Sequence, residues 1–341
     1  MSNRWPGGLI RKTPVTPAGP FQSGAAPGVW TLAEAAYWTK QGLWPIAGNI
    51  LDGTFAIFAL GCASGAVTTR NKYTYSGDAV SAGGAATVAS INGSAAGNYT
   101  VGIFALGSVA GVASTTRNKY TYVGCVVSAG SAATAASTCG SAAGNSTVGI
   151  FALGVDTCLN PTTTRNKYTY SGCVVSAGGA STANSKNGSA AGSSTVGIFA
   201  LGRAASPSTT RNKYTYSGCV VSAGTAATAA SSRGSATGNS TFGIFALGDV
   251  GNFCYSSTRN KYTYSGDVVS AGTAATAASL LGSAAGNNTV GIFALGYVSC
   301  AAVNTRNKYT YAGCVVSAGG AATAASNNGS AASNGTAGVN S

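Results

Sequence analysis

The pattern of apolar and polar positions repeats six times along the chain. Each copy opens on an apolar run of strand type, IFALG, and continues after a loop with TRNKYTY. Successive side chains of TRNKYTY would face opposite sides of a strand. Tyr73 and Tyr75 then share one side, while Arg70, Lys72 and Thr74 share the other. The IFALG runs begin at Ile57, Ile103, Ile150, Ile198, Ile244 and Ile292, and the TRNKYTY segments at Thr69, Thr116, Thr164, Thr210, Thr258 and Thr305. A period of 46 to 48 residues indicates a repeat fold whose units pack on their neighbours.

Two more short extended runs complete each unit, GTAATAAS and GSAAGN, and the second ends in a tight turn. Four strands in about 47 residues predict one blade of a β-propeller. The unit resembles the repeats of kelch-type propellers, with an apolar strand ending in Gly, a variable loop and then a strand carrying aromatic residues. It departs from them in having a single Gly in place of a diglycine and in lacking the later Trp.

The two ends of the repeat region are complementary. The first unit begins at Thr54 with no GSAAGN strand before it, and residues 329–336 form such a strand with no IFALG after it. Pairing them completes a sixth blade and removes an exposed edge, whereas an open solenoid or an intertwined fibre needs no complementary ends. We therefore predict an all-β fold, a six-bladed kelch-like β-propeller over residues 51–341, closed by its C-terminal strand. A disordered low-complexity chain is the alternative that the small-residue composition raises.

Before the propeller, residues 1–28 are rich in Pro and Gly and predict an extended arm. Residues 29–50 predict a Trp-rich helical module. Thr31 and Glu34 form a capping box, Leu32 to Gln41 are good helix formers, and Gly42 and Pro45 end the helix.

This module resembles a segment of tail fibre and other structural proteins of tailed bacteriophages, with a GVWTL start and a closing GLWP. The matching residues are Gly28, Val29, Trp30, Thr31, Leu32, Gly42, Trp44 and Pro45. The resemblance implies a virion protein, present in multiple copies or as a homo-oligomer. The residues we expect to attach it to other virion proteins are Trp30, Leu32, Tyr37, Trp38 and Trp44.

The formal net charge is +13, and twelve of the nineteen basic residues are the Arg and Lys of the six TRNK segments. A symmetric band of such residues would attract anionic surfaces, such as phosphorylated or acidic polysaccharide. Alternatively, these side chains lie over the Tyr rings of the repeats and have a structural role. No nucleic-acid-binding motif accompanies the charge, so we expect no nucleic acid partner.

Two segments differ between copies while the rest is nearly constant: the loop after IFALG and the pair of residues before GSA. Strand parity in a four-stranded blade places both on the same face of the propeller, which predicts a recognition face on a rigid scaffold. Drift between duplicated copies would also vary loops more than strands. The candidate ligand-binding residues are Asp156, Asn160, Lys186, Arg203, Arg233, Asp249, Asn252, Tyr255 and Tyr297.

The chain has no His, six acidic residues and nine Cys without a CxxC pair. Cys125, Cys173, Cys219 and Cys314 occupy a position where two copies carry Asp78 and Asp267, so this position is neither an obligatory disulfide nor a metal ligand. We expect no enzyme, cofactor or metal site. A polysaccharide-degrading enzyme would need two converging carboxylates, and Asp156 and Asp249 are two blades apart.

The chain has no apolar run of signal-peptide type and none that approaches the length of a membrane span. We expect synthesis in the host cytoplasm and residence in the virion. The predicted function is that of a tail-associated structural protein, which attaches by its N-terminal segment and presents the loop face to a host-surface receptor or glycan. The alternative is an architectural subunit that decorates or cements the particle.

Overall fold

The computed structural model describes residues 30–40, 53–252 and 254–335, in two compact units, Met1–Leu51 and Asp52–Ser341. In the first unit, helix α1 spans Leu32–Lys40 and begins with the predicted capping box. The Glu34 N–H donates to Thr31 Oγ1 at 3.2 Å, and the Thr31 N–H donates to Glu34 Oε2 at 2.9 Å. The Thr31 N–H and the Thr31 hydroxyl both donate to Glu34 Oε2, and these two bonds lower the pKa of the Glu34 carboxyl. The predicted arm, residues 1–28, and Trp44 lie outside the described residues.

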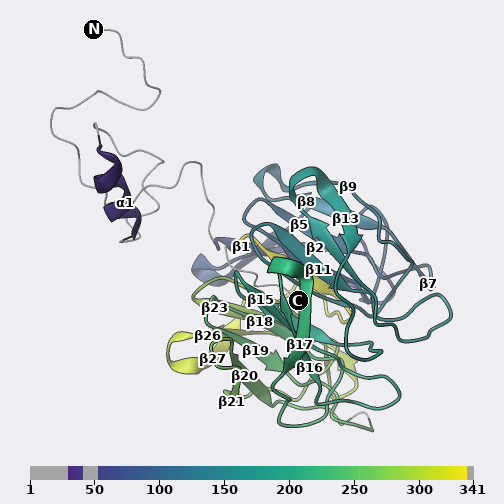
Figure 1. The fold of residues 1–341 in the computed structure, drawn as a ribbon. Coiled ribbons are helices and arrows are strands. Elements are labelled where there is room, and N and C mark those ends of the chain that lie inside the picture. The colour runs from purple at the N-terminus through teal and green to yellow at the C-terminus, as the bar shows by residue number, and fades with distance from the viewer. Residues whose placement is uncertain (1–29, 41–52, 253, 336–341) are drawn as a thin grey trace. The chain divides into compact units, whose positions relative to one another are not determined.

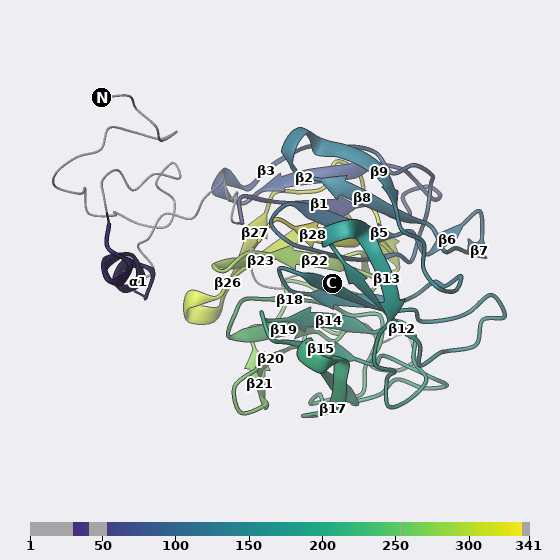
Figure 2. The ribbon, with the colours of Figure 1, turned by 45° about the horizontal axis from the view of Figure 1, so that its top comes forward.

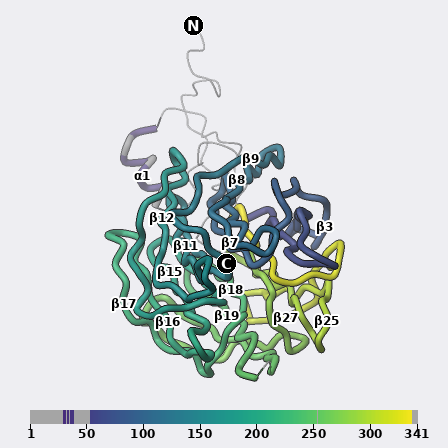
Figure 3. Tube along the Cα trace, turned by 90° about the vertical axis from the view of Figure 1, so that its right-hand side faces the viewer, coloured from purple at the N-terminus to yellow at the C-terminus, as the bar shows by residue number. Residues whose placement is uncertain are grey.

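The second unit is a six-bladed β-propeller (Figure 1). Each blade is an antiparallel sheet of four strands, and the blades follow one another around a central axis in chain order (Figure 3). The innermost strands carry the GSAA motif and lie against one another around the axis. They are β28 (Ser330–Ser333), β4 (Ser94–Gly97), β10 (Ser141–Gly144), β14 (Ser189–Gly192), β18 (Ser235–Gly238) and β22 (Ser283–Gly286).

The IFALG runs form the second strands, which are almost entirely buried because neighbouring blades cover both faces. They are β1 (Phe55–Ala59), β5 (Val101–Ala105), β11 (Val148–Ala152), β15 (Val196–Ala200), β19 (Phe242–Ala246) and β23 (Val290–Ala294). The third strands begin at the Arg of TRNKYTY. They are β2 (Arg70–Thr74), β8 (Arg117–Thr121), β12 (Arg165–Thr169), β16 (Arg211–Thr215), β20 (Arg259–Thr263) and β26 (Arg306–Thr310).

The outer strands form the rim, and here the sequence prediction was wrong. The third extended run was assigned to GTAATAAS, but the strand is the preceding VVSAG segment. The outer strands are β3 (Ala79–Ala82), β9 (Val126–Gly130), β13 (Val174–Ala177), β17 (Val220–Gly224), β21 (Val268–Gly272) and β27 (Val315–Gly319). GTAATAAS instead crosses from the rim of one blade to the inner strand of the next. This crossing covers three strand spacings, roughly 14 Å, which about four extended residues can span.

Short elements complete the propeller. Single 3₁₀ turns join third and outer strands: η1 (Ser76–Asp78), η2 (Val123–Cys125), η3 (Ser171–Cys173), η4 (Ser217–Cys219) and η5 (Ala312–Cys314). Two of the loops after IFALG form two-residue hairpins: β6 (Ser108–Val109) with β7 (Val112–Ala113), and β24 (Tyr297–Val298) with β25 (Ala301–Ala302).

The predicted ring closure is confirmed. Strand β28 pairs antiparallel with β1, with Ala332 opposite Ile57, and it also lies against β22 and β4 (Figure 2). Asn334 reproduces across this junction the turn that the other blades make within a continuous chain. Its Oδ1 accepts the Phe55 N–H at 3.0 Å, as Asn98 Oδ1 accepts the Val101 N–H at 3.0 Å. The first blade is therefore built from both ends of the propeller.

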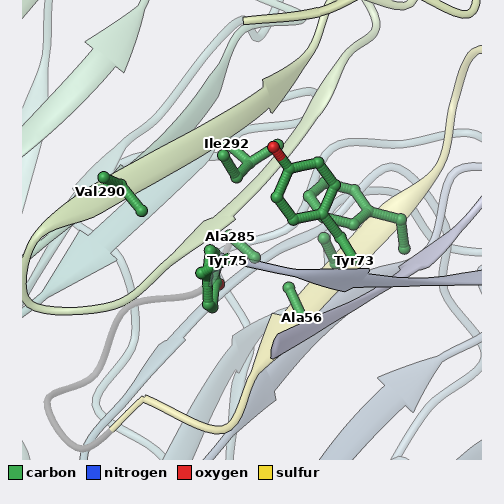
Figure 4. Close-up of a cluster of buried hydrophobic side chains, with 8 residues drawn as sticks. Ala56, Tyr73, Tyr75, Ala285, Val290 and Ile292 are labelled. Carbon is green, nitrogen blue, oxygen red and sulfur yellow. The ribbon is translucent and has the colours of Figure 1, made fainter. Parts of the chain in front are cut away.

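Between neighbouring blades, side chains from the second strand of one blade pack against side chains from the third strand of the next. Ile292 of the sixth blade packs with Tyr73 and Tyr75 of the first, together with Val290 and Ala285 (Figure 4). The same Ile-to-Tyr contact recurs at the other described layers. The prediction that Tyr73 and Tyr75 share one side of the strand is therefore confirmed, and this side faces the preceding blade.

Candidate functional site

The two variable segments meet on one face of the propeller, which we call the loop face. Isolated β-bridges join the residue pair before GSA to the first residue of the loop after IFALG in every blade. The bridged pairs are Cys62 with Asn327, Ile91 with Ser108, Thr138 with Val155, Lys186 with Arg203, Ser232 with Asp249, and Leu280 with Tyr297. The differences between copies are thus concentrated in one continuous surface.

A closed ring of backbone hydrogen bonds encircles the axis beneath this surface. Each donor is the second residue of the variable pair, and its N–H reaches the carbonyl oxygen of the equivalent residue in the preceding blade at 2.8 to 3.0 Å. The six axial residues are Asn92, Cys139, Asn187, Arg233, Leu281 and Asn328, and all have φ between 54° and 58°. Sequence reasoning selected only Arg233 among them. The signal it missed is that each directly precedes the Gly of GSA at the centre of a ring.

The Gly that ends IFALG is required by this ring. Gly107 has φ +73°, and a Cβ there would lie 2.4 Å from the carbonyl oxygen of Asn92. Because that carbonyl accepts the Cys139 N–H at 3.0 Å, a side chain at Gly107 would displace an acceptor of the ring. The glycine that marks each repeat therefore keeps the axial backbone constant while the neighbouring side chains vary.

The predicted basic residues form one sector of the loop face. Lys186 and Arg203 exchange both backbone hydrogen bonds, and the Arg233 N–H donates to Asn187, the next residue after Lys186. All three side chains are half-buried. Burial raises the pKa of the neighbouring Cys139 thiol, while the charges of Lys186 and Arg233 act in the opposite direction. This sector provides positive charge close to the axis.

The two predicted acidic residues mainly shape their loops. Asp249 is only 2 % exposed; its Oδ1 accepts the Gly251 N–H, and its Oδ2 lies 3.4 Å from Arg233 Nη1. Asp156 Oδ1 accepts the N–H groups of Cys158 and Asn160 at 2.8 and 2.9 Å. Asp249 therefore holds Arg233 in place, and its own carboxylate is not accessible to a ligand.

The remaining candidates lie on the third, fifth and sixth blades, and Tyr297 occupies the same position in its loop as Arg203 does. Asn160 and Asn252 are exposed, and Tyr255 and Tyr297 are half-buried. The Tyr255 hydroxyl donates to Cys300 Sγ of the next blade at 3.6 Å, a contact that raises the pKa of the phenol. These residues supply amide and aromatic groups around the basic sector.

The six TRNK arginines are not on the surface. Each is 1 % exposed and lies between two blades, with its guanidinium 4.4 to 4.7 Å from the centroid of the next blade's Phe ring. Each also donates one hydrogen bond from Nη2 to the Oδ1 of the next blade's TRNK Asn, at 3.0 to 3.2 Å. We call Arg70, Arg117, Arg165, Arg211, Arg259 and Arg306 the arginine belt. Its position supports the structural interpretation of the repeated charge, although the rings stacked on most closely are those of Phe.

The opposite face consists of nearly constant turns. In most blades the Asn of GNxT accepts hydrogen bonds from its own turn, and Asn98 and Asn145 also donate from Nδ2 to the next blade at 2.9 Å. The Cys or Asp after the TRNKYTY Gly faces a lysine of the preceding blade. Lys119 lies 3.6 Å from Cys173 Sγ, and Lys213 and Lys308 pair with Asp267 and Asp78 at 3.0 Å. This explains how one position accepts either residue.

Within the described residues, no three His, Cys, Asp or Glu side chains cluster as metal ligands would, and all nine cysteines are free thiols. The helices described are all too short to cross a membrane. In the first unit, Tyr37 is 55 % exposed and meets Trp38 edge-on, with ring centroids 5.1 Å apart. Trp30 is half-buried, and the Leu32 side chain lies outside the description.

Fold and site together define the class of protein: a closed six-bladed β-propeller with one variable and one nearly constant face. A scan of family models gives no match for the chain, and a search of curated proteins gives none either.

Proposed function

We propose that this chain is a display protein whose loop face binds glycans on a cell surface. The observation that carries the proposal is the gathering of both variable segments of every blade into one surface, joined by β-bridges. A rigid ring supports that surface, so different side chains are presented without changing the backbone. The basic sector at Lys186, Arg203 and Arg233 favours an acidic glycan, because positive charge near the axis attracts carboxylate, sulfate or phosphate groups.

The setting we propose is the tail of a bacteriophage particle, with attachment through residues 29–50. This part of the proposal rests on the resemblance of GVWTL and GLWP to phage tail proteins and on the exposed Tyr37 of helix α1. Deletion of residues 1–50 is expected to abolish incorporation into particles. Normal incorporation of the deleted chain would contradict attachment through this segment.

The test of recognition exchanges loops. The loops beginning at Val155, Asp249 and Tyr297 are replaced by the shorter loop beginning at Cys62, and the labelled protein is applied to a glycan microarray that includes acidic glycans. We expect the fold to persist, as judged by circular dichroism and thermal unfolding, and glycan binding to be lost.

The matched control alters the opposite face. The GNST turn of the third blade, residues 144–147, is replaced by GSST, which the fourth blade carries at residues 192–195. This variant is expected to bind normally. Unchanged binding by the loop-exchanged protein, or equal loss in both variants, would show that the loop face does not carry recognition.

A second candidate function is lateral packing in a particle. The outer strands expose one valine each in five blades, 55 to 58 % exposed at Val126, Val174, Val220, Val268 and Val315. Such uncharged edges are suited to contact with another sheet. Under this alternative, replacing these valines by Lys prevents incorporation, whereas exchange of the loops does not.

A further inference from the structure

One position on the face opposite the loop face carries Cys in four blades and Asp in two. It is the last residue of the turn that follows TRNKYTY, and its φ lies between 50° and 56° in every blade, so the side chain always starts from the same backbone conformation. The six residues are Asp78, Cys125, Cys173, Cys219, Asp267 and Cys314. The two aspartates therefore show which partners this position offers to an anion.

Each aspartate binds a lysine of the preceding blade and a tyrosine of its own blade. Asp78 Oδ1 accepts the Tyr73 hydroxyl at 2.7 Å, and both carboxylate oxygens lie 3.0 Å from Lys308 Nζ. Asp267 makes the equivalent two contacts in the fifth blade, at 3.0 Å to the lysine and 3.1 Å to the tyrosine. A carboxylate at this position thus joins two neighbouring blades.

At Cys173 the same two partners face a thiol. Lys119 Nζ lies 3.6 Å from Cys173 Sγ, and the Tyr168 hydroxyl lies beside the same thiol. This hydroxyl is buried and makes no hydrogen bond of good geometry within the described residues. Burial and then the contact with Cys173 raise the pKa of Tyr168 to about 12. An ammonium group and a phenol O–H therefore converge on a sulfur atom, which is a weak acceptor.

We propose that Cys173 is a site of oxidation by hydrogen peroxide, and that its sulfinate binds Lys119 and Tyr168 as the aspartate carboxylate binds the equivalent partners. In the first step the sulfur attacks one peroxide oxygen, an S–O bond forms, the O–O bond breaks, and the thiol proton leaves with the other oxygen as water. A second peroxide reacts in the same way with the resulting sulfenic acid and again releases water. The sulfur loses two electron pairs, each of which reduces one peroxide, and the sulfinic acid releases its proton to solvent.

The position has access to solvent and room for two oxygen atoms. Cys173 is half-buried, and the Asp78 side chain at the equivalent position is 32 % exposed while both of its oxygens contact their partners. A sulfinate has the charge and the two acceptor oxygens of that carboxylate. It therefore needs no enclosed cavity, and the site is separate from the proposed recognition surface on the loop face.

The cysteine at the same position of the second blade, Cys125, is an internal control. The lysine equivalent to Lys119 is Lys72, and its Nζ lies over the Phe55 ring, 4.3 Å from the ring centroid. This ammonium group is engaged by the ring rather than by a thiol. We therefore expect Cys173 to accumulate sulfinate before Cys125 does.

The test exposes the folded full chain to hydrogen peroxide and follows each cysteine by mass spectrometry. After tryptic digestion, Cys173 is the single Cys of peptide 168–186. We expect this peptide to gain two oxygen atoms while Cys125 is still a thiol, and Tm of the oxidised protein to rise by about 2 °C. In crystals of the oxidised protein, the sulfinate oxygens should lie within hydrogen-bonding distance of Lys119 Nζ and the Tyr168 hydroxyl. Equal oxidation of the two cysteines, or sulfinate oxygens directed only to solvent, would overturn the proposal.

Two variants separate this effect from general oxidative damage. Cys173→Asp places at this position the residue of the first and fifth blades, so it should raise Tm without peroxide, and peroxide should then add no further rise. Lys119→Met should slow sulfinate formation at Cys173 relative to Cys125 in the same sample and remove the rise in Tm. A Cys173→Asp protein no more stable than the wild type, or a full rise in Tm for Lys119→Met, would contradict the proposal.

Discussion

Replacement of Asn334 by Ala tests the closure of the ring at a single side chain. Asn334 Oδ1 accepts the buried Phe55 N–H at 3.0 Å, and its Nδ2 donates to Thr54 Oγ1 at 2.9 Å. Loss of the acceptor leaves a buried N–H unsatisfied, which costs about 1–3 kcal/mol, and loss of the second bond costs about 0.5–1.5 kcal/mol. We therefore expect Asn334→Ala to lower the free energy of unfolding by about 2–4 kcal/mol. At about 2–4 °C per kcal/mol for a domain of roughly this size, Tm should fall by roughly 4–16 °C.

The assay combines calorimetry with hydrogen exchange, and Asn239→Ala is the matched control. Asn239 holds the equivalent turn within a continuous chain, where its Oδ1 accepts from the Thr241 hydroxyl and from the N–H groups of Thr241 and Phe242. Both variants should lose stability, but only Asn334→Ala should increase exchange in β28 and β1, because only there can a chain end separate. An unchanged Tm, or the same exchange in β28 for both variants, would refute the closure argument.

Three further predictions concern two loop-face glycines, the axial residue Leu281 and the buried tyrosines. Gly111→Ala should lower the free energy of unfolding by about 1–2 kcal/mol, because φ at Gly111 is +83° but no atom lies within 4 Å of the added Cβ. Gly107→Ala should lower it clearly more, because its Cβ would meet the Asn92 carbonyl oxygen. Chemical denaturation of the two variants compares these losses. Leu281→Asn should stabilise the fold by about 0.5–1 kcal/mol, because Asn tolerates the φ of 58° better than Leu, yet weaken glycan binding on the array. Absorbance titration near pH 11 should ionise only a minority of the sixteen tyrosines before unfolding, since burial raises the pKa of the repeat tyrosines to about 12 or above. The tyrosine contribution to stability should be constant below about pH 10, the pKa of an unfolded Tyr, and should fall as pH rises toward 12. The lowered pKa of the fewer belt arginines acts in the opposite direction and reduces this fall.

The period and the complementary ends were sufficient to predict six blades and their closure, because ring geometry depends on the number of units and on strand parity. The same parity placed the variable segments on one face, and it survived the wrong assignment of GTAATAAS because the number of strands per blade did not change. That assignment failed because an extended run of Ala and Thr has the same sequence pattern in a strand and in a crossover. Only pairing distinguishes them, and β17 ends at Gly224, where the crossover begins.

The positions of charged side chains were harder to predict, because they depend on packing between repeats. Arg70 and Tyr73 lie on opposite sides of β2 as predicted, but the sequence does not reveal that the next blade covers Arg70 as completely as the preceding blade covers Tyr73. For the same reason Asp249 was selected as a ligand-binding residue, although its carboxylate is enclosed and paired with Arg233.

The axial ring provides the strongest physical argument that the loop face is more than drifted sequence. Its hydrogen bonds require a positive φ at all six positions, and Asn, which tolerates that conformation, occupies Asn92, Asn187 and Asn328. Arginine does not favour a positive φ, but the Arg233 guanidinium pairs with the buried Asp249, and this ion pair stabilises the residue in its position. Leu281 is half-buried and has the same positive φ, which a branched apolar side chain tolerates less well than Asn does. Backbone strain of this kind clusters at functional positions. Stability alone would place Asn or Gly there, so the leucine favours a role in contacting something outside the chain.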